Sequence, residues 1–446
     1  MSEFKMSVED SLTAIAAGNP QLNAFITVCA ERAREQVKKA PKGILHRVPF
    51  GLKDQYDVAG LVTTQGSHRF RDKVATEDSA VYRALSGAGA VLMGKTNLSD
   101  HGISFEASSY VGGPTRNPFD PRRTAGGSSG GSASAVAAGL VDFDWGSDIG
   151  GSIRLPAAYC GVFGMRLSSE TWPVVDMVMP EGLRWMCGQG PLTRELSQMK
   201  TVLKAARALR IGAQRPFTLR GARAWSPAVA GEWPTFATEV LPLLRELGDA
   251  LPETALPDTT TLRNLYSWVW ASHFDDLLAH NSDMSAIDGI VAAVSAVVFR
   301  GKFGDRRFYP LTAEILLLMA AGRLSIYRGP AKARAKAHAF RARMQGLWDQ
   351  GLVVVQPVSV FSPPFIGKSN RNTNALSCTI PGNLSDATGL SMPFGTFANG
   401  MPRAIQLLGP PGSEDVLIAM AEKLLALPKY PALPVPAMRF GARAAA

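Results

Sequence analysis

The sequence predicts an α/β fold in which a β-sheet is covered by helices on two faces. Strand and helix patterns alternate near both ends of the chain, which is typical of such a layered sheet. The 446 residues are 46% hydrophobic and 19% charged, an ordinary globular composition that argues against a mainly disordered chain. The middle of the chain, by contrast, has a mostly helical pattern. No Gly/Ser-rich linker bounds this middle part, so we expect one domain over residues 1–446.

The N-terminal elements follow from local signals. Ser7 can cap a first helix, with Asp10 three residues later, and Gly18 can end it. A short apolar run at Val48–Leu52 suits a buried strand that leads into Lys53. The other expected elements are strands at Leu22–Val28 and Ala90–Met93 and helices at Glu31–Lys39 and Asp78–Leu85.

The C-terminal elements have equally clear boundaries. The β-branched run Leu352–Val355 predicts a strand that stops at Pro357, and Ala404–Leu408 predicts another. Ser413 can cap a last helix that Pro428 ends. We therefore expect a core over about residues 48–195 and 350–428, with a variable helical insertion over about 196–347.

Charge and cysteine usage narrow the class of protein. The net charge is +10, and the segment from Arg300 to Arg343 carries +9 of it. Part of that segment reads as an Ala-, Lys- and Arg-rich helix with a solvated basic face, so we expect no nucleic-acid site. The four cysteines lie far apart and form no CxxC pair, which suits a reducing compartment. The two most apolar runs, Ile290–Phe299 and Ile315–Ala321, are too short to span a bilayer and are expected to be buried helices.

The most informative segment is the glycine-serine run over residues 126–132. Four glycines and three serines within seven residues are too costly in chain entropy to fill a core. A phosphate loop would need a lysine after Gly131, where Ser132 stands. A nucleophile elbow fits around Ser128 or Ser129, but it would need a catalytic histidine downstream. The histidines beyond it are His273, His280 and His338, and none lies in a Gly- or Asp-rich loop.

A third interpretation includes a second segment, GSDIGGSIRLP over residues 146–156. Gly150 and Gly151 place bare backbone before Ser152, and successive N–H groups in such a turn can form an oxyanion hole. Asp148 and Arg154 flank this turn and could pair to make it rigid. Together with Lys53 at a strand end, the pattern gives two serines and a lysine on separate loops. A neutral lysine can act as a base where no histidine does.

These motifs resemble those of the amidase signature family. The matching stretches are VPFGLKDQYDVAG, VLMGKTNLSDHG, NPFDPRRTAGGSSGGSASAVAAGL, GSDIGGSIRLPAAYCGVFGMR, GPLTREL and MPRAIQLLG. The resemblance covers essentially the whole chain. It implies the amidase signature fold, a large mixed β-sheet core between helices with a helical substrate-binding insertion, and hydrolysis of amides without a metal or an organic cofactor.

The resemblance also assigns site residues. Its Ser–cis-Ser–Lys triad falls on Ser152 as nucleophile, Ser128 as bridging serine after a cis peptide bond with Gly127, and Lys53 as base. The oxyanion donors fall on the backbone of Ile149, Gly150, Gly151 and Ser152, with Ser129, Asp148 and Arg154 as supporting residues. Ser147 stands where the family usually has threonine, which keeps the hydroxyl group.

The substrate is the part that the resemblance leaves open. We expect a serine amidohydrolase that cleaves an amide, and also ester or carbamate (urethane) bonds, of a small to medium apolar or aryl substrate. Large apolar side chains after Ser152 suggest a roomy pocket: Trp172, Met177, Met179, Trp185 and Met186. The alternative is a protein like the A-type component of a tRNA-dependent glutamine amidotransferase, favoured by the stretch LNAFITVCAERA. The chain is expected to be cytoplasmic and to have no membrane span, and a homodimer is left open.

Overall fold

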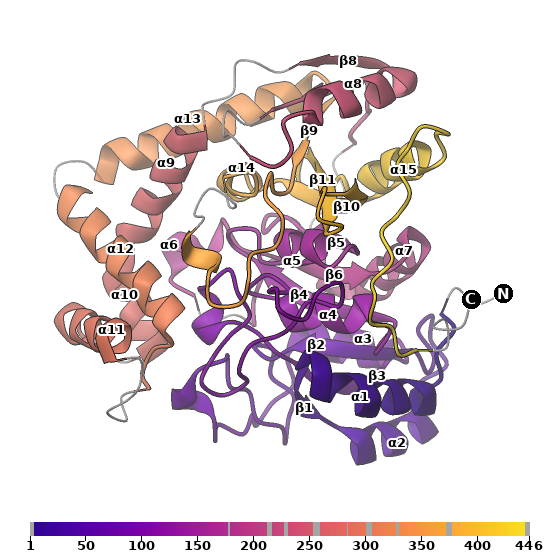
Figure 1. Ribbon diagram of the computed structural model, residues 1–446, viewed down its shortest axis with the longest axis vertical. Helices are drawn as coiled ribbons and strands as arrows, with labels where there is room; N and C mark the ends of the chain where they lie inside the picture. Colours follow the sequence, from indigo (N-terminus) through magenta and orange to yellow (C-terminus); the bar gives the residue numbers. More distant parts are fainter. Residues whose placement is uncertain are drawn as a thin grey trace.

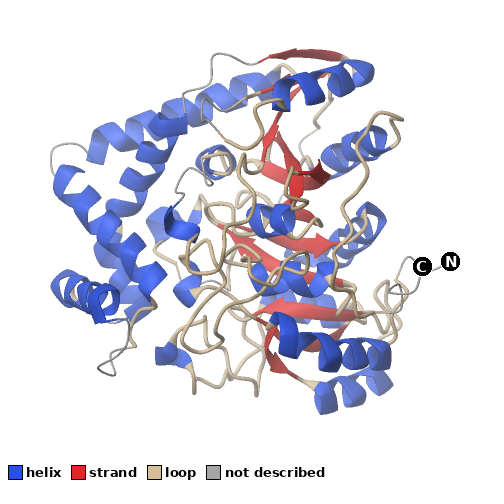
Figure 2. Ribbon diagram, in the orientation of Figure 1, coloured by secondary structure: helices blue, strands red, loops and turns tan. Residues whose placement is uncertain are grey.

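The computed structural model describes the chain except for a few short segments. The described residues are 4–176, 179–211, 216–226, 231–252, 259–282, 284–299, 306–326, 330–371 and 377–441. They form an α/β fold whose strands run through the molecule as one sheet, with helices on both of its sides (Figures 1 and 2). The fold class predicted from the alternating pattern is therefore confirmed.

The sheet has eleven strands within the described residues, in the order β1-β3-β2-β4-β6-β5-β10-β11-β9-β7-β8. It is mixed, because β2 pairs in parallel with both β3 and β4 and β7 in parallel with β8 and β9, while the other pairs are antiparallel. The strands are β1 (Phe25–Val28), β2 (Pro49–Lys53), β3 (Val91–Thr96), β4 (Phe143–Asp148), β5 (Phe163–Arg166), β6 (Gly188–Thr193), β7 (Gly221–Ala224), β8 (Asp249–Pro252), β9 (Leu352–Pro357), β10 (Thr388–Thr396) and β11 (Pro402–Gly409).

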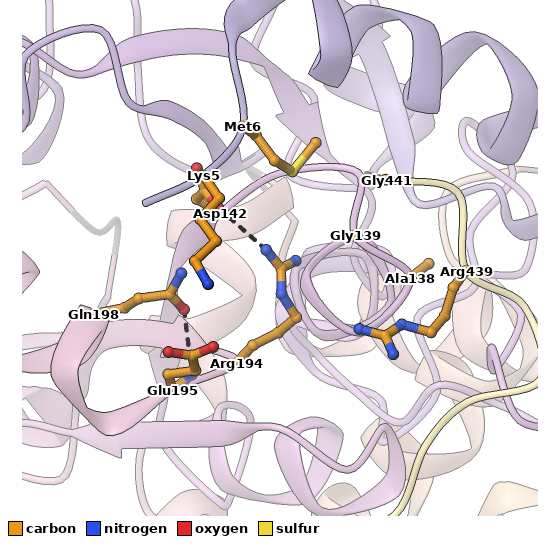
Figure 3. Close-up of a pocket in the computed structure, with 10 residues that line it drawn as sticks. All are labelled: Lys5, Met6, Ala138, Gly139, Asp142, Arg194, Glu195, Gln198, Arg439 and Gly441. Carbon is orange, nitrogen blue, oxygen red and sulfur yellow. Dashed lines mark hydrogen bonds and ion pairs between the residues drawn. The ribbon is translucent and has the colours of Figure 1, made fainter. Parts of the chain in front are cut away.

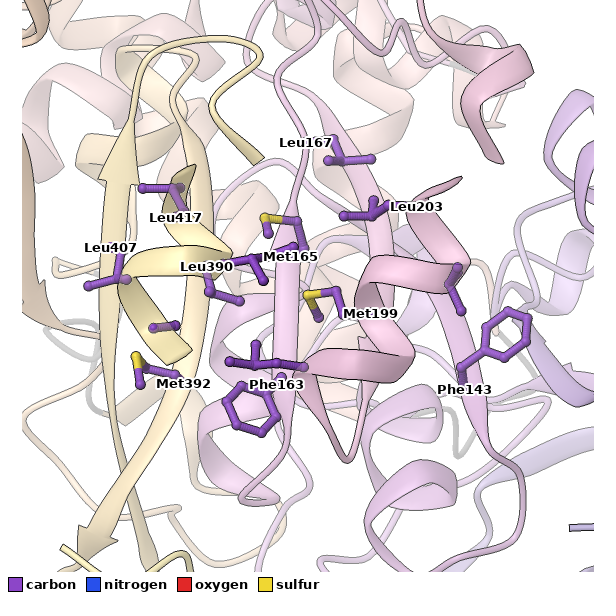
Figure 4. Close-up of a cluster of buried hydrophobic side chains, with 14 of the residues drawn as sticks. Phe143, Phe163, Met165, Leu167, Met199, Leu203, Leu390, Met392, Leu407 and Leu417 are labelled. Atoms are coloured by element: carbon purple, nitrogen blue, oxygen red, sulfur yellow. The ribbon is translucent and has the colours of Figure 1, made fainter. Parts of the chain in front are cut away.

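Helices pack against both faces of this sheet. The helices are α1 (Val8–Leu22), α2 (Ala30–Lys39), α3 (Ala80–Gly87), α4 (Gly130–Ala137), α5 (Arg154–Tyr159), α6 (Glu181–Arg184), α7 (Leu196–Ala205), α8 (Phe236–Leu247), α9 (Thr259–Ala271), α10 (Phe274–Ser282), α11 (Ala286–Phe299), α12 (Pro310–Ile326), α13 (Pro330–Asp349), α14 (Ile380–Leu384) and α15 (Glu414–Leu425). Figure 4 shows one of the contacts, where methionine and leucine side chains of β5, β10 and β11 meet those of α7 and α15. β9 shows the effect of this cover most clearly, because its residues from Leu352 to Val355 form a continuous apolar run that is buried throughout.

The first helix confirms one local prediction and corrects another. Ser7 and Asp10 form the expected capping box at the start of α1. The helix does not end at Gly18, however, but continues to Leu22, where Asn23 adopts a left-handed backbone conformation. Gly18 is needed for packing instead, because a Cβ atom at this position would lie 2.7 Å from the Phe440 ring. The glycine thus lets the C-terminal segment lie against α1.

The middle region is less purely helical than expected. Strands β7 and β8 lie within it and extend the main sheet beyond β9, so part of residues 196–347 belongs to the core. Helices α9 to α13 form a helical body on one side of the sheet (Figure 1). No helix in the described ranges is long and apolar enough to cross a membrane.

The expectation that both apolar runs are buried is wrong for α11. Ile287, Val291, Val294 and Val298 follow one another on one face of this helix, and each is exposed by 45–74%. The opposite face, with Ala292, Ala293 and Ala296, packs into the helical body. The run is apolar on both faces, so its sequence pattern could not tell the buried face from the exposed one.

Charged side chains line a cavity near the two chain ends, and two of them form an ion pair (Figure 3). The Arg194 guanidinium lies 3.1 Å from Asp142 and also donates to the carbonyl groups of Val136 and Val141. Lys5 and Arg439, from the two terminal segments, line the same cavity. The residues that line this cavity include no serine, threonine, cysteine or histidine, and we interpret the cavity as a junction between the terminal segments and the core.

Candidate active site

Lys53 ends the buried strand β2, between β3 and β4, and its side chain is fully buried. The Lys53 Nζ lies 2.6 Å from Ser128 Oγ and 2.9 Å from Ser147 Oγ. Ser147 in turn donates to Gln55 Oε1 over 2.7 Å. The structure thus brings Lys53 and Ser128 together. It gives the hydroxyl of Ser147, noted above only as a substitute for threonine, a place beside Lys53, and it adds Gln55, which the sequence motifs did not single out.

The burial of Lys53 changes its protonation. Loss of hydration lowers the pKa of Lys53 to about 7, although the carboxylates of Asp148 and Asp144 act in the opposite direction. A lysine with this pKa is neutral in about half of the molecules near pH 7. Its amine can then accept a proton, which an ordinary surface lysine does not do at this pH.

Ser128 is held in place by a crowded glycine turn. The Gly127–Ser128 peptide bond is cis, as the resemblance implied, and Gly126 has a φ of +86°. A Cβ atom at Gly127 would lie 2.6 Å from the backbone of the segment 104–106, so no larger residue fits there. The turn continues into α4, and Ser129 donates from its backbone N–H to Ser152 O over 3.1 Å. This bond joins the two serine loops.

Ser152 lies on the loop between β4 and α5, which an ion pair makes rigid. Arg154 and Asp148 are both fully buried and pair at 2.9 Å, as predicted from their positions. Burial alone would raise the pKa of Asp148, but Arg154 and Arg166 hold it well below its usual range. Thr379 braces the same loop by donating to Gly150 O over 2.6 Å.

The backbone donors on this loop are fewer than expected. The Gly151 N–H, one of the predicted oxyanion donors, donates to Asp148 Oδ1 over 2.9 Å and is therefore engaged within the protein. Among the described residues, the N–H groups of Ile149, Gly150 and Ser152 have no such acceptor. The sequence could not reveal this, because a glycine turn does not show which N–H the neighbouring carboxylate will take.

Both serines line one cavity. Its lining consists of Gln55, Gln65, Leu98, His101, Gly102, Ile103, Ser128, Ser147, Ile149, Ser152, Met179, Trp270 and Leu277, around about 540 Å³ of space that includes open solvent at its mouth. This combination of large apolar side chains with a few polar groups is typical of sites for small organic molecules. In this part of the structure no hydrogen bond joins Ser152 Oγ to Ser128 Oγ. Such contacts are often long in the absence of substrate and shorten when it binds.

The apolar wall of the cavity differs from the expected one. Of the five large side chains named after Ser152, Met179 lines the cavity, whereas Trp172 and Met186 lie in the hydrophobic cores. Trp185 is packed against a core, and Met177 lies outside the described residues. The wall is instead built by Trp270 of α9 and Leu277 of α10, which only the three-dimensional structure brings to Ser152.

The described histidines that were named from the sequence lie away from the serines, whereas one that was not named lines the cavity. His273 pairs loosely with Asp276 at 3.5 Å and His338 is exposed on α13, so neither lies at the serines. The side chain of His280 lies outside the described residues. His101, upstream of the glycine-serine run, lines the cavity and was not singled out. Within the described ranges, no group of three His, Cys, Asp or Glu side chains is arranged to hold a metal ion.

Comparison with known proteins identifies the family of the chain. A family model described as Amidase matches residues 6–211 and 226–418. The chain is 30% identical over 470 residues to the A-type subunit of glutamyl-tRNA(Gln) amidotransferase from Anaeromyxobacter dehalogenans, covering 94% of this chain and 91% of that protein. It is also 30% identical over 455 residues to the putative amidase AmiB2 of Mycobacterium bovis, with the same coverage of 94% and 91%.

A solved structure shares the fold. The structure of 6-aminohexanoate cyclic dimer hydrolase superposes with a TM-score of 0.74 at 22% sequence identity, covering 94% of this chain and 93% of that one. The family match extends over most of the chain and includes the lysine strand and both serine loops. The chain therefore belongs to the amidase signature family, whose members are enzymes acting on carbon–nitrogen bonds.

Proposed function

We propose that this enzyme is a serine amidohydrolase that forms an acyl-enzyme on Ser152. The observation that carries the proposal is the contact of a buried lysine, with a pKa of about 7, with Ser128 in the cavity that Ser152 also lines. In the proposed mechanism, Ser152 attacks the amide carbon and gives its hydroxyl proton to Ser128. Ser128 passes its own proton on to neutral Lys53. The proton then returns through Ser128 to the leaving nitrogen, and a water molecule hydrolyses the acyl-enzyme.

The tetrahedral intermediate needs donors for its negative oxygen. The backbone N–H groups of Ile149, Gly150 and Ser152 are the candidates, because they are not taken by protein acceptors in the described structure. Gly151 serves a different purpose in this proposal, since its bond to Asp148 fixes the turn. Loss of one such donor typically costs about 2.7–4 kcal/mol in the transition state.

The cavity wall supports an apolar or aryl substrate. Met179, Trp270 and Leu277 offer large apolar surfaces beside the polar groups of Ser128 and Ser152. The same acyl-enzyme chemistry would also cleave an activated ester or a carbamate. Which of the three bonds is preferred depends on how these walls hold the acyl group.

The alternative is action as the amide-cleaving component of a tRNA-dependent amidotransferase. The similarity to the glutamyl-tRNA(Gln) amidotransferase component favours it. The similarity to a putative amidase is equally high, and an apolar wall suits the side chain of glutamine poorly. We therefore favour hydrolysis by the chain alone.

A substrate panel tests the proposal. The purified protein is given p-nitroanilides, nitrophenyl esters and aryl carbamates of increasing acyl length, and ammonia release from glutamine is measured in parallel. We expect release of nitroaniline from medium-length apolar anilides, and no release by Ser152→Ala. Ammonia release from glutamine without any anilide cleavage would favour the amidotransferase alternative instead.

A further inference from the structure

His101 has a buried polar side chain that takes no part in the proposed proton transfer. It lies on the short turn after β3, in a left-handed backbone conformation with φ of +53°, and its side chain is 1% exposed. The ring packs against Phe70 and Phe308, with ring centroids 6.0 and 5.7 Å away. The imidazole is therefore held in one orientation, in a residue that lines the cavity of Ser128 and Ser152.

The ring nitrogens of His101 have no well-formed hydrogen bond. The Arg307 backbone lies close enough for a weak hydrogen bond that favours the protonated ring. Within the described residues, however, neither nitrogen has a partner that meets both the distance and the angle of a hydrogen bond. Asp100 Oδ1 is 3.9 Å from Nε2, too far for a hydrogen bond, and the other oxygen of Asp100 accepts from Tyr309 N. Buried polar groups are nearly always paired, so an unpaired ring beside a cavity indicates a missing ligand.

The position of the turn indicates which part of a substrate it would meet. Gly102 follows His101 directly, and a Cβ atom at Gly102 would lie 3.8 Å from Ser128 Oγ. In the proposed mechanism, on which this step rests, Ser128 returns the proton to the leaving nitrogen. The His101 turn then lies on the side of the leaving amine rather than on the side of the acyl group.

The chemistry around the ring favours an uncharged ligand. Burial lowers the pKa of His101 to about 4, and burial raises the pKa of Asp100 to about 7. A neutral imidazole offers one donor and one acceptor, which match a hydroxyl group or a carboxamide. A purely apolar leaving group would leave both ring nitrogens unpaired, at a cost in affinity.

We propose that His101 is a specificity-determining residue that hydrogen-bonds an uncharged polar group, a hydroxyl or a carboxamide, on the leaving amine of the substrate. The substrate class is then an amide with an apolar acyl part and a neutral polar amine part.

Two isosteric amines test this directly by binding. Calorimetry measures the affinities of 3-aminobenzyl alcohol and 3-ethylaniline, which differ in a hydroxyl against a methyl group, for the Ser152→Ala variant. We expect the alcohol to bind about tenfold more tightly, as one hydrogen bond allows. Equal affinities would overturn the proposal, and this comparison requires no substitution at His101. Because no turnover is measured, the result does not depend on the proposed acyl-enzyme.

Substitution then assigns the preference to the ring. In the Ser152→Ala background, His101→Phe should reduce the ratio of affinities to about one by weakening the alcohol alone. His101→Asn keeps one donor and one acceptor and tolerates a left-handed backbone, so part of the ratio should remain. His338→Phe, on the exposed face of α13, is the matched control and should keep the full ratio. An unchanged ratio in His101→Phe, or an equal loss for both amines, would overturn the assignment.

Turnover of the corresponding amides gives a second readout. The wild type should hydrolyse N-[3-(hydroxymethyl)phenyl]butanamide with a kcat/KM about tenfold above that of N-(3-ethylphenyl)butanamide, and His101→Phe should remove this difference without slowing the ethyl compound more than about threefold. Cleavage of neither amide by a protein that still shows the binding preference would count against the proposed function and leave the subsite standing. Equal cleavage of both by the wild type would count against the subsite.

Discussion

The two sides of the cavity are built in different ways. The floor, formed by the end of β2 and the two serine loops, consists of buried polar groups that hydrogen bonds and ion pairs hold, such as Lys53 with Ser128 and Asp148 with Arg154. The wall, formed by α9 and α10, consists of side chains such as Trp270 and Leu277 that hold their place by apolar packing. Removing the partner of a buried polar group lowers the stability of the fold. An apolar wall, by contrast, tolerates changes in the shape of its side chains.

This difference separates two properties of the enzyme. In the proposed mechanism the floor determines the reaction, because each group in it depends on several others. The wall is proposed to determine the size and shape of the substrate, and to be able to change without disturbing the proton path. Substitutions in the floor should therefore abolish turnover, and substitutions in the wall should redirect it.

The largest effect is expected at Ser152. Ser152→Ala should lower kcat/KM by about 10⁴-fold or more, as the loss of a nucleophile does in serine hydrolases, while the melting temperature stays close to that of the wild type. Ser134→Ala is the matched control, because this buried serine on α4 donates to Arg116 O outside the cavity. Near-normal turnover by Ser152→Ala would place the nucleophile elsewhere.

Lys53 should come next, with a signature in pH. Because burial lowers the pKa of Lys53 to about 7, the neutral amine forms as pH rises through that value. Wild-type kcat/KM should rise through about pH 7 and then level off. Lys53→Arg should lose roughly 10³-fold or more at every pH, because a guanidinium does not give up its proton. Lys336→Arg, on the exposed face of α13, should change nothing. An arginine variant at position 53 with normal activity and the same profile would make Lys53 structural.

Asp144 should have a smaller effect on the same profile. Its buried carboxylate raises the pKa of Lys53, so Asp144→Asn should move the midpoint of the kcat/KM profile to lower pH, by up to about one unit. Asp142→Asn is a control on the same strand region, since Asp142 faces Arg194 in the terminal cavity. A midpoint that moves to higher pH, or that moves equally in both variants, would contradict the electrostatic account.

The smallest effect on rate is expected in the wall. Trp270→Ala should leave kcat/KM for a short acyl anilide within about threefold and raise it for a bulkier acyl group, changing the ratio by about tenfold. Trp268→Ala, two residues earlier on α9, removes a side chain that contacts Lys336 and should leave the ratio unchanged. A collapse of turnover with every substrate would show that the wall also positions the floor.

The same contrast explains what could be predicted from the sequence. Lys53, Ser152 and the Asp148–Arg154 pair lie in short motifs whose residue pattern indicated a site, and the resemblance to the amidase signature family then assigned their roles and chose Ser128 within the glycine-serine run. Trp270 and Leu277 reach the cavity only through the packing of distant helices, and no local pattern marks them. His101 was missed for a related reason, because a lone histidine in a turn carries no signal until its unpaired ring is seen beside the cavity. The strands β7 and β8 were missed because each has four residues, too few to show a period.

The central claim is that Ser152 carries the acyl group, and one measurement tests it most directly. The wild-type protein is treated with a fluorophosphonate probe, digested and analysed by mass spectrometry. We predict a single adduct on Ser152, formed faster as pH rises through about 7 and nearly absent in Lys53→Arg. An adduct on Ser128 or Ser129 would instead identify the glycine-serine turn as the nucleophile's position and contradict the account.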